Sequence, residues 1–167
     1  MLVNALTYIS IDAAVVLYAA AISVRLYWRN GCQDGLARLA WSAGCILYIT
    51  HVVCAFTAFY CWSHSVAYRE TARQASEFFP GTGGGGLYLN YLFTAVWLID
   101  ASAWWRGLAA YRGLPRRVQW PTQTFLAFMI FNGAAVFAKG PFRFAAWGLT
   151  AMVFAATLAG RARRTAP

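Results

Sequence analysis

The chain has 167 residues, of which 60% are hydrophobic and 11% are charged, and its formal net charge is +9. A soluble domain carries about a quarter charged residues, so five acidic and 14 basic residues are too few to cover a compact water-soluble protein. This composition excludes an ordinary cytosolic enzyme and a disordered chain. It indicates a multi-span membrane protein.

Every basic residue except Lys139 is an arginine, and the arginines lie in short segments between apolar stretches. In a soluble protein this excess of positive charge would suggest a nucleic-acid partner. In a membrane protein it is explained by orientation in the bilayer and by contact with lipid headgroups. The sequence contains no nucleic-acid-binding motif, so the partners that we expect are the lipid bilayer and other membrane protein subunits, with no nucleic acid.

The apolar stretches predict an all-α fold, an integral membrane helical bundle with five transmembrane helices in a single domain, 1–167. A hydrocarbon core of about 30 Å requires roughly 17–25 residues per helix. We expect the spans at about 4–28, 36–62, 87–105, 121–138 and 141–160. Pro121 is expected in the first turn of the fourth span. Lys139-Gly140-Pro141 is expected to be a tight turn, the alternative being one long kinked helix.

The basic residues also predict the orientation, because cytoplasmic loops carry an excess of Lys and Arg. With the N-terminus outside, most of them fall on the inner side. We therefore expect the N-terminus outside and the C-terminus in the cytoplasm. The inner residues would be Arg25, Arg29, Arg38, Arg106, Arg112, Arg116, Arg117, Arg161, Arg163 and Arg164, and the outer ones Arg69, Arg73, Lys139 and Arg143.

The segment 63–86 is the longest non-spanning segment and is predicted to be an outer loop. Its first part favours a juxtamembrane helix, in which Arg73 is spaced for ion pairs with Glu70 and Glu77. The helix is expected to stop at Pro80, and the glycine run that follows is expected to form a turn that approaches another element closely. The run has no Gly-Lys-Ser/Thr, so it is no phosphate-binding loop. The residues that we expect to contact a partner protein are Trp62, Tyr68, Arg69, Arg73, Phe78 and Phe79.

Ionisable groups inside a membrane are expensive and mark candidate sites. Asp12, His51 and Asn132 lie near the middle of three expected spans and are predicted to form one buried polar layer, with Asp12 accepting a hydrogen bond from His51. The layer has two interpretations, a proton relay or ligand pocket, and an interhelical polar clamp. Asp100 and Arg106 are expected to form a pair at the inner interface or to snorkel toward it.

The pattern His51-x-x-Cys54 followed by Cys61-x-x-His64 suggests ligands for a metal or haem. On a continuous helix the two histidines would lie about 20 Å apart, so they cannot share one metal unless the chain bends back after Trp62. We therefore predict no metal site. Haem b remains an alternative, with His51 paired to a methionine or to a second copy of the chain, and His51, Cys54 and His64 are the candidate contacts.

The residues from His51 to Trp105 resemble a group of bacterial multi-span membrane proteins. The resemblance rests on His51-Val-Val-Cys-Ala-Phe, on Trp62-Ser-His, and on Gly84-Gly-Gly-Leu-Tyr-Leu-Asn-Tyr. It implies a shared outer-loop structure, location in the bacterial inner (cytoplasmic) membrane, and no particular activity. The second span of the group is richer in histidine, where this chain has Thr57, Tyr60 and Cys61.

Three functions from different classes are compatible with these features. The first is a non-catalytic accessory subunit of a larger membrane complex of respiratory or photosynthetic type, which the small size and the absence of a catalytic motif favour. The second is a small haem-binding or electron-transfer protein centred on His51. The third is a proton-coupled carrier that uses Asp12, His51 and Asn132, although five spans without a visible repeat are a poor basis for alternating access.

Overall fold

The structure is a computed structural model that describes residues 2–27, 31–78, 80–107, 110–111 and 113–133. It confirms that the described part of the chain is all-α. Its five helices are α1 (Leu2–Tyr27), α2 (Gly31–Ala58), α3 (His64–Ser76), α4 (Gly86–Trp105) and α6 (Arg116–Phe131). The expected span 141–160, the turn at Lys139-Gly140-Pro141 and the end of the expected span 121–138 lie outside the described residues.

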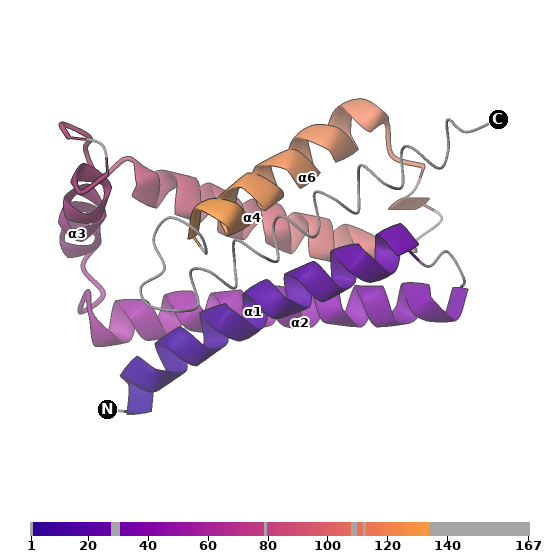
Figure 1. Ribbon diagram of the computed structural model, residues 1–167, viewed down its shortest axis with the longest axis horizontal. Coiled ribbons are helices and arrows are strands. Elements are labelled where there is room, and N and C mark those ends of the chain that lie inside the picture. Colours follow the sequence, from indigo (N-terminus) through magenta and orange to yellow (C-terminus); the bar gives the residue numbers. More distant parts are fainter. Residues whose placement is uncertain (1, 28–30, 79, 108–109, 112, 134–167) are drawn as a thin grey trace.

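Four long helices lie side by side, and α3 runs across one end of them (Figure 1). Helices α1 and α2 pack against each other along their length, α4 packs on α2, and α6 packs on α4. The helix bundle thus has two ends, which we call the α3 end and the arginine end. The arginine end is where α1 and α4 end and α2 and α6 begin, and the arginines that the described helices and turns place there are Arg25, Arg38, Arg106, Arg116 and Arg117.

The core between α1, α2 and α4 is built from aromatic side chains. Trp41, Trp97 and Trp104 are at most 1% exposed. The rings of Trp41 and Trp104 are stacked, with centroids 5.2 Å apart and planes 5° apart, and the ring of Trp97 lies 5.7 Å from Trp41. Such ring pairs contribute about 0.5–1.5 kcal/mol each beyond the area that they bury. The ring of Tyr18 on α1 lies 5.1 Å from Trp41 and 5.9 Å from Trp97, so the packing of these rings joins three helices.

Gly44 allows α2 to approach its neighbours closely at this point. A Cβ atom at Gly44 would lie 3.3 Å from Cζ2 of Trp97, and 3.4 Å from both the Ala14 carbonyl oxygen and Cβ of Leu17. The small residue therefore sits where α1, α2 and α4 meet, as expected for close helix packing.

Helices α1 and α2 are the two described helices that are long and apolar enough to cross a membrane, over Leu2–Val24 and Asp34–Ala58. A core helix of a soluble protein or an N-terminal signal sequence has the same length and composition. The extent of burial distinguishes a membrane span from the core helix of a soluble protein, because such a core helix is mostly buried. Only 33% and 28% of the most apolar stretches of α1 and α2 are buried.

Two helix boundaries differ from those expected. Helix α2 ends at Ala58 rather than near 62, because Cys61 and Trp62 adopt left-handed φ angles of 47° and 56° and reverse the chain. Helix α6 begins at Arg116, after Pro115 at its N-cap, so the prediction of Pro121 in the first turn is wrong. The Gln119 amide donates to the Leu114 carbonyl at 2.8 Å, which supports the earlier start. Pro121 lies inside the helix and removes one backbone hydrogen bond.

Candidate functional site

His51 lies on the face of α2 that packs against α1. Its Nδ1 is 2.8 Å from the carbonyl oxygen of Thr7, and because a carbonyl only accepts, His51 donates. The hydroxyl of Ser10 donates to the same carbonyl at 3.2 Å. Thr7 and Ser10 are almost fully buried. The result is a small polar seam between α1 and α2. The second ring nitrogen of His51, Nε2, makes no hydrogen bond to any residue in the part of the chain that the structure describes.

The expected polar layer is only partly assembled. Asp12 is near enough to His51 for their charges to interact. The prediction that Asp12 accepts a hydrogen bond from His51 is nevertheless wrong, because the carbonyl of Thr7, five residues before Asp12 on α1, accepts it. Asn132 follows the last residue of α6, which packs on α4, and no described hydrogen bond joins it to Asp12 or His51. His51 is also not at the middle of α2, because it lies halfway between Gly44, at the middle of the helix, and Ala58, at its end.

His64 lies apart from His51, at the start of α3. Its Nδ1 is 3.1 Å from the hydroxyl of Tyr91, and its Nε2 is 3.5 Å from the hydroxyl of Tyr88. Ser63 caps the helix by accepting from the backbone N–H of Val66 at 3.5 Å. Both ring nitrogens of His64 are thus occupied by tyrosines at the start of α4, and the imidazole anchors α3 to α4.

The chain reverses at Cys61 and Trp62, but the reversal does not bring the two histidines into a common site. Cys54 lies one turn after His51 on α2 and is partly buried. Among the described residues no three His, Cys, Asp or Glu side chains are grouped as metal ligands would be. The absence of a metal site and the haem alternative both stay predictions.

Most of the expected partner contacts lie on the surface at the α3 end. Trp62 is 65% exposed, and Arg69 and Phe78 are also exposed. Tyr68 differs, because its ring and backbone are in contact with Gly84 and form part of the fold. Phe79 lies outside the described residues.

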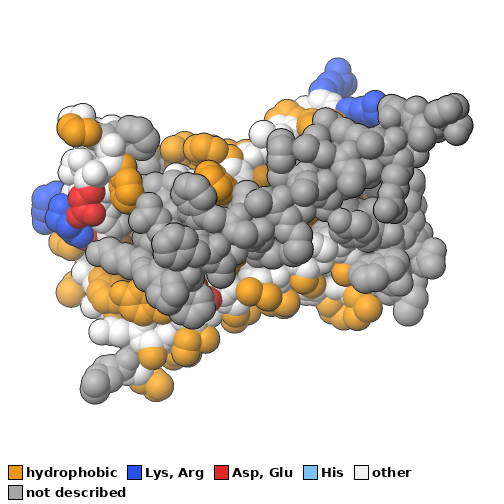
Figure 2. Space-filling model, in the orientation of Figure 1, with side chains coloured by type: hydrophobic (Ala, Val, Ile, Leu, Met, Phe, Trp, Pro, Cys, Tyr) orange, Lys and Arg blue, Asp and Glu red, His pale blue; other side chains and the backbone are white. Residues whose placement is uncertain are grey.

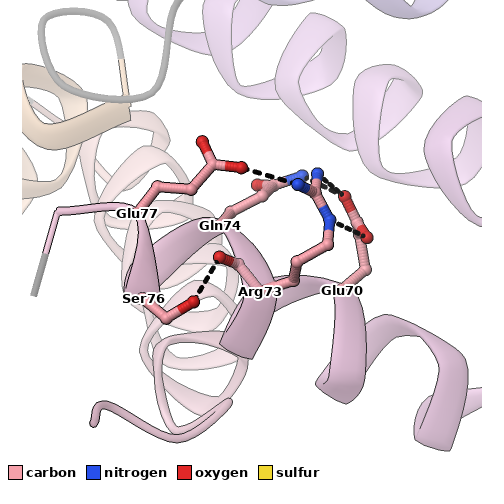
Figure 3. Close-up of polar contacts among 5 residues, drawn as sticks. All are labelled: Glu70, Arg73, Gln74, Ser76 and Glu77. Atoms are coloured by element: carbon pink, nitrogen blue, oxygen red, sulfur yellow. Dashed lines mark hydrogen bonds and ion pairs between the residues drawn. The ribbon is translucent and has the colours of Figure 1, made fainter. Parts of the chain in front are cut away.

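Arg73 is fully occupied within α3 (Figure 3). Its guanidinium donates to Glu70 at 2.7 Å and 2.9 Å, and to Glu77 at 2.6 Å. The hydrogen bonds and charge of Glu70, followed by those of Glu77, raise the pKa of Arg73 above its ordinary value. The spacing of these residues had predicted both pairs. The charge of Arg73 is therefore balanced by glutamates of the same chain. The other arginine of α3 is Arg69.

The glycine run packs directly on α3. A Cβ atom at Gly84 would overlap the carbonyl oxygen of Tyr68 and lie 2.8 Å from Cγ and Cδ1 of its ring. A Cβ at Gly86 would lie 3.2 Å from Cγ2 of Thr71. The close approach expected of this run is therefore present, and its target is α3.

Sequence reasoning missed a buried polar cluster near the arginine end. The hydroxyl of Tyr111 donates to Oδ1 of Asp100 at 2.7 Å, and the amide of Gln123 is 3.0 Å from that hydroxyl and 3.3 Å from Oδ1. Asp100 is 6% exposed. The expected pairing of Asp100 with Arg106 is wrong, because six residues turn a helix by about 600° and place the two on different faces. The sequence did offer one signal: Asp100 lies in an apolar segment, and a carboxylate buried there needs hydrogen-bond donors from other parts of the chain.

No protein-family model, curated protein or solved structure matches the chain. The resemblance of the segment from His51 to Trp105 to bacterial membrane proteins therefore stays a prediction, and the function has to be argued from the geometry.

Proposed function

We propose that the chain is a multi-span protein of the bacterial inner membrane with five spans, its N-terminus outside and its C-terminus in the cytoplasm. The distribution of charge supports this. The described residues between the arginine end and α3 include only two charged side chains, Asp12 and Asp100. Asp34 lies in the first turn of α2 and therefore belongs to the arginine end. Large apolar side chains are exposed on all four long helices, and they include Val16, Ile46, Ile99 and Phe128.

Helix α4 fits the same placement although it is not one of the two described helices that are long and apolar enough to cross a membrane. Its 20 residues correspond to about 30 Å, the thickness of the hydrocarbon core. The exposed Tyr88 and Tyr91 lie near its start, and the exposed Trp105 lies at its end. Hydropathy indices rate these residues as weakly polar, but they are the residues enriched at the two membrane interfaces. Their positions support α4 as a span.

Within the membrane, we infer that the protein is a non-catalytic accessory subunit of a larger complex of respiratory or photosynthetic type. The observation that carries this is an exposed aromatic patch at the α3 end, made by Tyr8, Phe59 and Trp62. Tyr8 and Trp62 are 63% and 65% exposed. The rings of Tyr8 and Phe59 are 6.5 Å apart, and Phe59 is joined to Trp62 through Tyr60 and Phe56, with successive ring centroids 6.5, 5.4 and 5.8 Å apart. Figure 2 shows apolar side chains at this end beside the charges of α3. Exposed aromatic clusters of this kind are typical of protein contacts.

The interior supports a structural role as well. The three core tryptophans fill the space between α1, α2 and α4, and the polar groups of His51, His64 and Asp100 are engaged by neighbours within the chain. These contacts stabilise the bundle. A chain with a tightly packed interior and exposed aromatic side chains at one end is suited to binding another membrane subunit.

The test is gentle detergent extraction from native membranes, followed by native electrophoresis. We expect the wild-type chain to migrate in a larger assembly and the double variant Phe59→Ser/Trp62→Ser to leave it. Trp120→Ser is the matched control, because Trp120 is 59% exposed but lies on α6 near the arginine end. Migration of the wild type as a lone 18.5 kDa chain in its detergent micelle would contradict the proposal.

A second function, haem binding or electron transfer, is favoured by one observation. Ligand histidines donate the N–H of their second ring nitrogen to a carbonyl or carboxylate. His51 does this toward Thr7, and its Nε2 makes no hydrogen bond to another described residue. The test is an absorbance spectrum of protein purified from native membranes, before and after dithionite. A Soret band that His51→Ala abolishes would establish this function, and its absence from the wild type would reject it.

A further inference from the structure

A shallow groove runs along the outer face of α4 toward the arginine end. It has a volume of about 250 Å³ and is lined by Leu98, Ile99, Ser102, Ala103 and Arg106. These residues follow each other at helical spacing, so they form one stripe about 12 Å long. The hollow exists because Ser102 and Ala103 are small and lie between the bulky pair Leu98 and Ile99 and the long side chain of Arg106.

The groove changes from apolar to cationic along its length. Ile99 is 70% exposed at the apolar end, and the hydroxyl of Ser102 donates back to the Leu98 carbonyl at 2.7 Å. Ser102 therefore offers no free proton to a ligand. At the other end Arg106 is exposed, and no described ion pair or hydrogen bond occupies its guanidinium. Helix α4 ends here because Gly107 has a φ of +117°.

A second cation lies beside the groove. The guanidinium carbon of Arg38 is 4.4 Å from the centre of the Trp105 ring, and the indole N–H of Trp105 donates to Ser42 at 2.9 Å. Trp105, the last residue of α4, is thereby held against α2 by Ser42 and Arg38. Arg106 follows it in the sequence. Two arginines and an interfacial tryptophan at the end of an apolar stripe match the chemistry of a membrane–water boundary.

We propose that this groove binds one anionic phospholipid, with an acyl chain along Leu98, Ile99 and Ala103 and the headgroup phosphate on Arg106. The proposal rests on the membrane placement of α4 given above. It does not depend on the accessory-subunit role. Charge complementarity selects the ligand, because the unoccupied guanidinium favours a phosphate that carries a net negative charge. A zwitterionic lipid offers a compensating ammonium and is bound less well.

The test is native mass spectrometry of the full chain in detergent, titrated with phosphatidylglycerol or with phosphatidylcholine. We expect one phosphatidylglycerol to be retained at about tenfold lower concentration than phosphatidylcholine, and Arg106→Gln to remove most of that preference. Arg117→Gln is the matched control, because it removes an exposed arginine from the same end outside the groove, and it should keep the preference.

A second variant tests the apolar part of the groove. Ser102→Phe fills the hollow, keeps Arg106 and lies on the surface, so it should fold and lose the retained lipid. Retention of phosphatidylglycerol by Ser102→Phe, an unchanged preference in Arg106→Gln, or an equal loss in Arg117→Gln would each overturn the proposal. If the chain still sediments with membranes, each of these outcomes rejects the lipid site but not the placement in the membrane.

Discussion

Replacing Gly84 by alanine tests how α3 is attached to the rest of the chain. The added Cβ would overlap the carbonyl oxygen of Tyr68 and lie 2.8 Å from two atoms of its ring. A ring can rotate, but the backbone of α3 moves only if the helix is displaced. Overpacking of this kind costs about 1–3 kcal/mol. We therefore expect Gly84→Ala to destabilise the chain by that amount and to loosen α3.

The adjacent Gly85 provides the control. A Cβ at Gly85 meets nothing within 4 Å, and its φ of −57° suits alanine. Gly85→Ala should change the stability by no more than about 0.5 kcal/mol. The assay is thermal unfolding in detergent together with hydrogen exchange of the α3 amides, and a shift of about 2–4 °C per kcal/mol is expected for a chain of this size.

Tyr68→Ala separates the ring from the backbone. It removes the two ring contacts but keeps the carbonyl oxygen, so Gly84→Ala should remain destabilising in that background and be rescued only in part. Equal melting temperatures for Gly84→Ala and Gly85→Ala, with unchanged exchange in α3, would refute the packing of the glycine run on this helix.

Three further predictions concern the bundle and its charges. Gly44→Leu should destabilise the chain by about 1–3 kcal/mol because its side chain would enter the space of Trp97, whereas Gly35→Leu, which meets nothing within 4 Å, should not; unfolding in detergent measures both. Tyr111→Phe should cost about 1.5–3 kcal/mol by removing a hydrogen bond to Asp100, whereas Tyr8→Phe, at a tyrosine that is 63% exposed, should cost less than about 0.5 kcal/mol. Equal losses would contradict the buried cluster. Because the pKa of Arg73 is raised, the stability that this group contributes is fully present below the ordinary arginine pKa and is lost only above it. Arg73→Gln should therefore leave the shape of the stability profile unchanged from about pH 6 to 9, and a slope that disappears in this variant would contradict the assignment.

The helices were predictable from the sequence because long apolar stretches and the internal ion pairs of α3 are local signals. The turn at Cys61 and Trp62 was not, because neither residue is a glycine and nothing in the local sequence marks a left-handed conformation. The start of α6 was missed for a similar reason. Pro121 looks like the first turn of a helix, but the Gln119 side chain and Pro115 set the boundary earlier.

The candidate sites were less predictable, because they depend on which residues meet across helices. Depth along a span placed Asp12 and His51 near each other, but it did not identify the Thr7 carbonyl as the acceptor, since every residue of a helix has a carbonyl. The partners of Asp100 lie 11 and 23 residues further along the chain. Nothing in their spacing relates Tyr111 and Gln123 to that carboxylate.

The placement in the membrane is the central claim, and labelling of single cysteines in intact cells tests it most directly. One variant keeps only the native Cys61, which is exposed at the α3 end, and another carries Arg117→Cys as its sole cysteine. A membrane-impermeant maleimide should label Cys61 in intact cells and position 117 only after lysis. Labelling of position 117 from outside, or a chain that stays in the supernatant of an ultracentrifuge spin without detergent, would contradict the account.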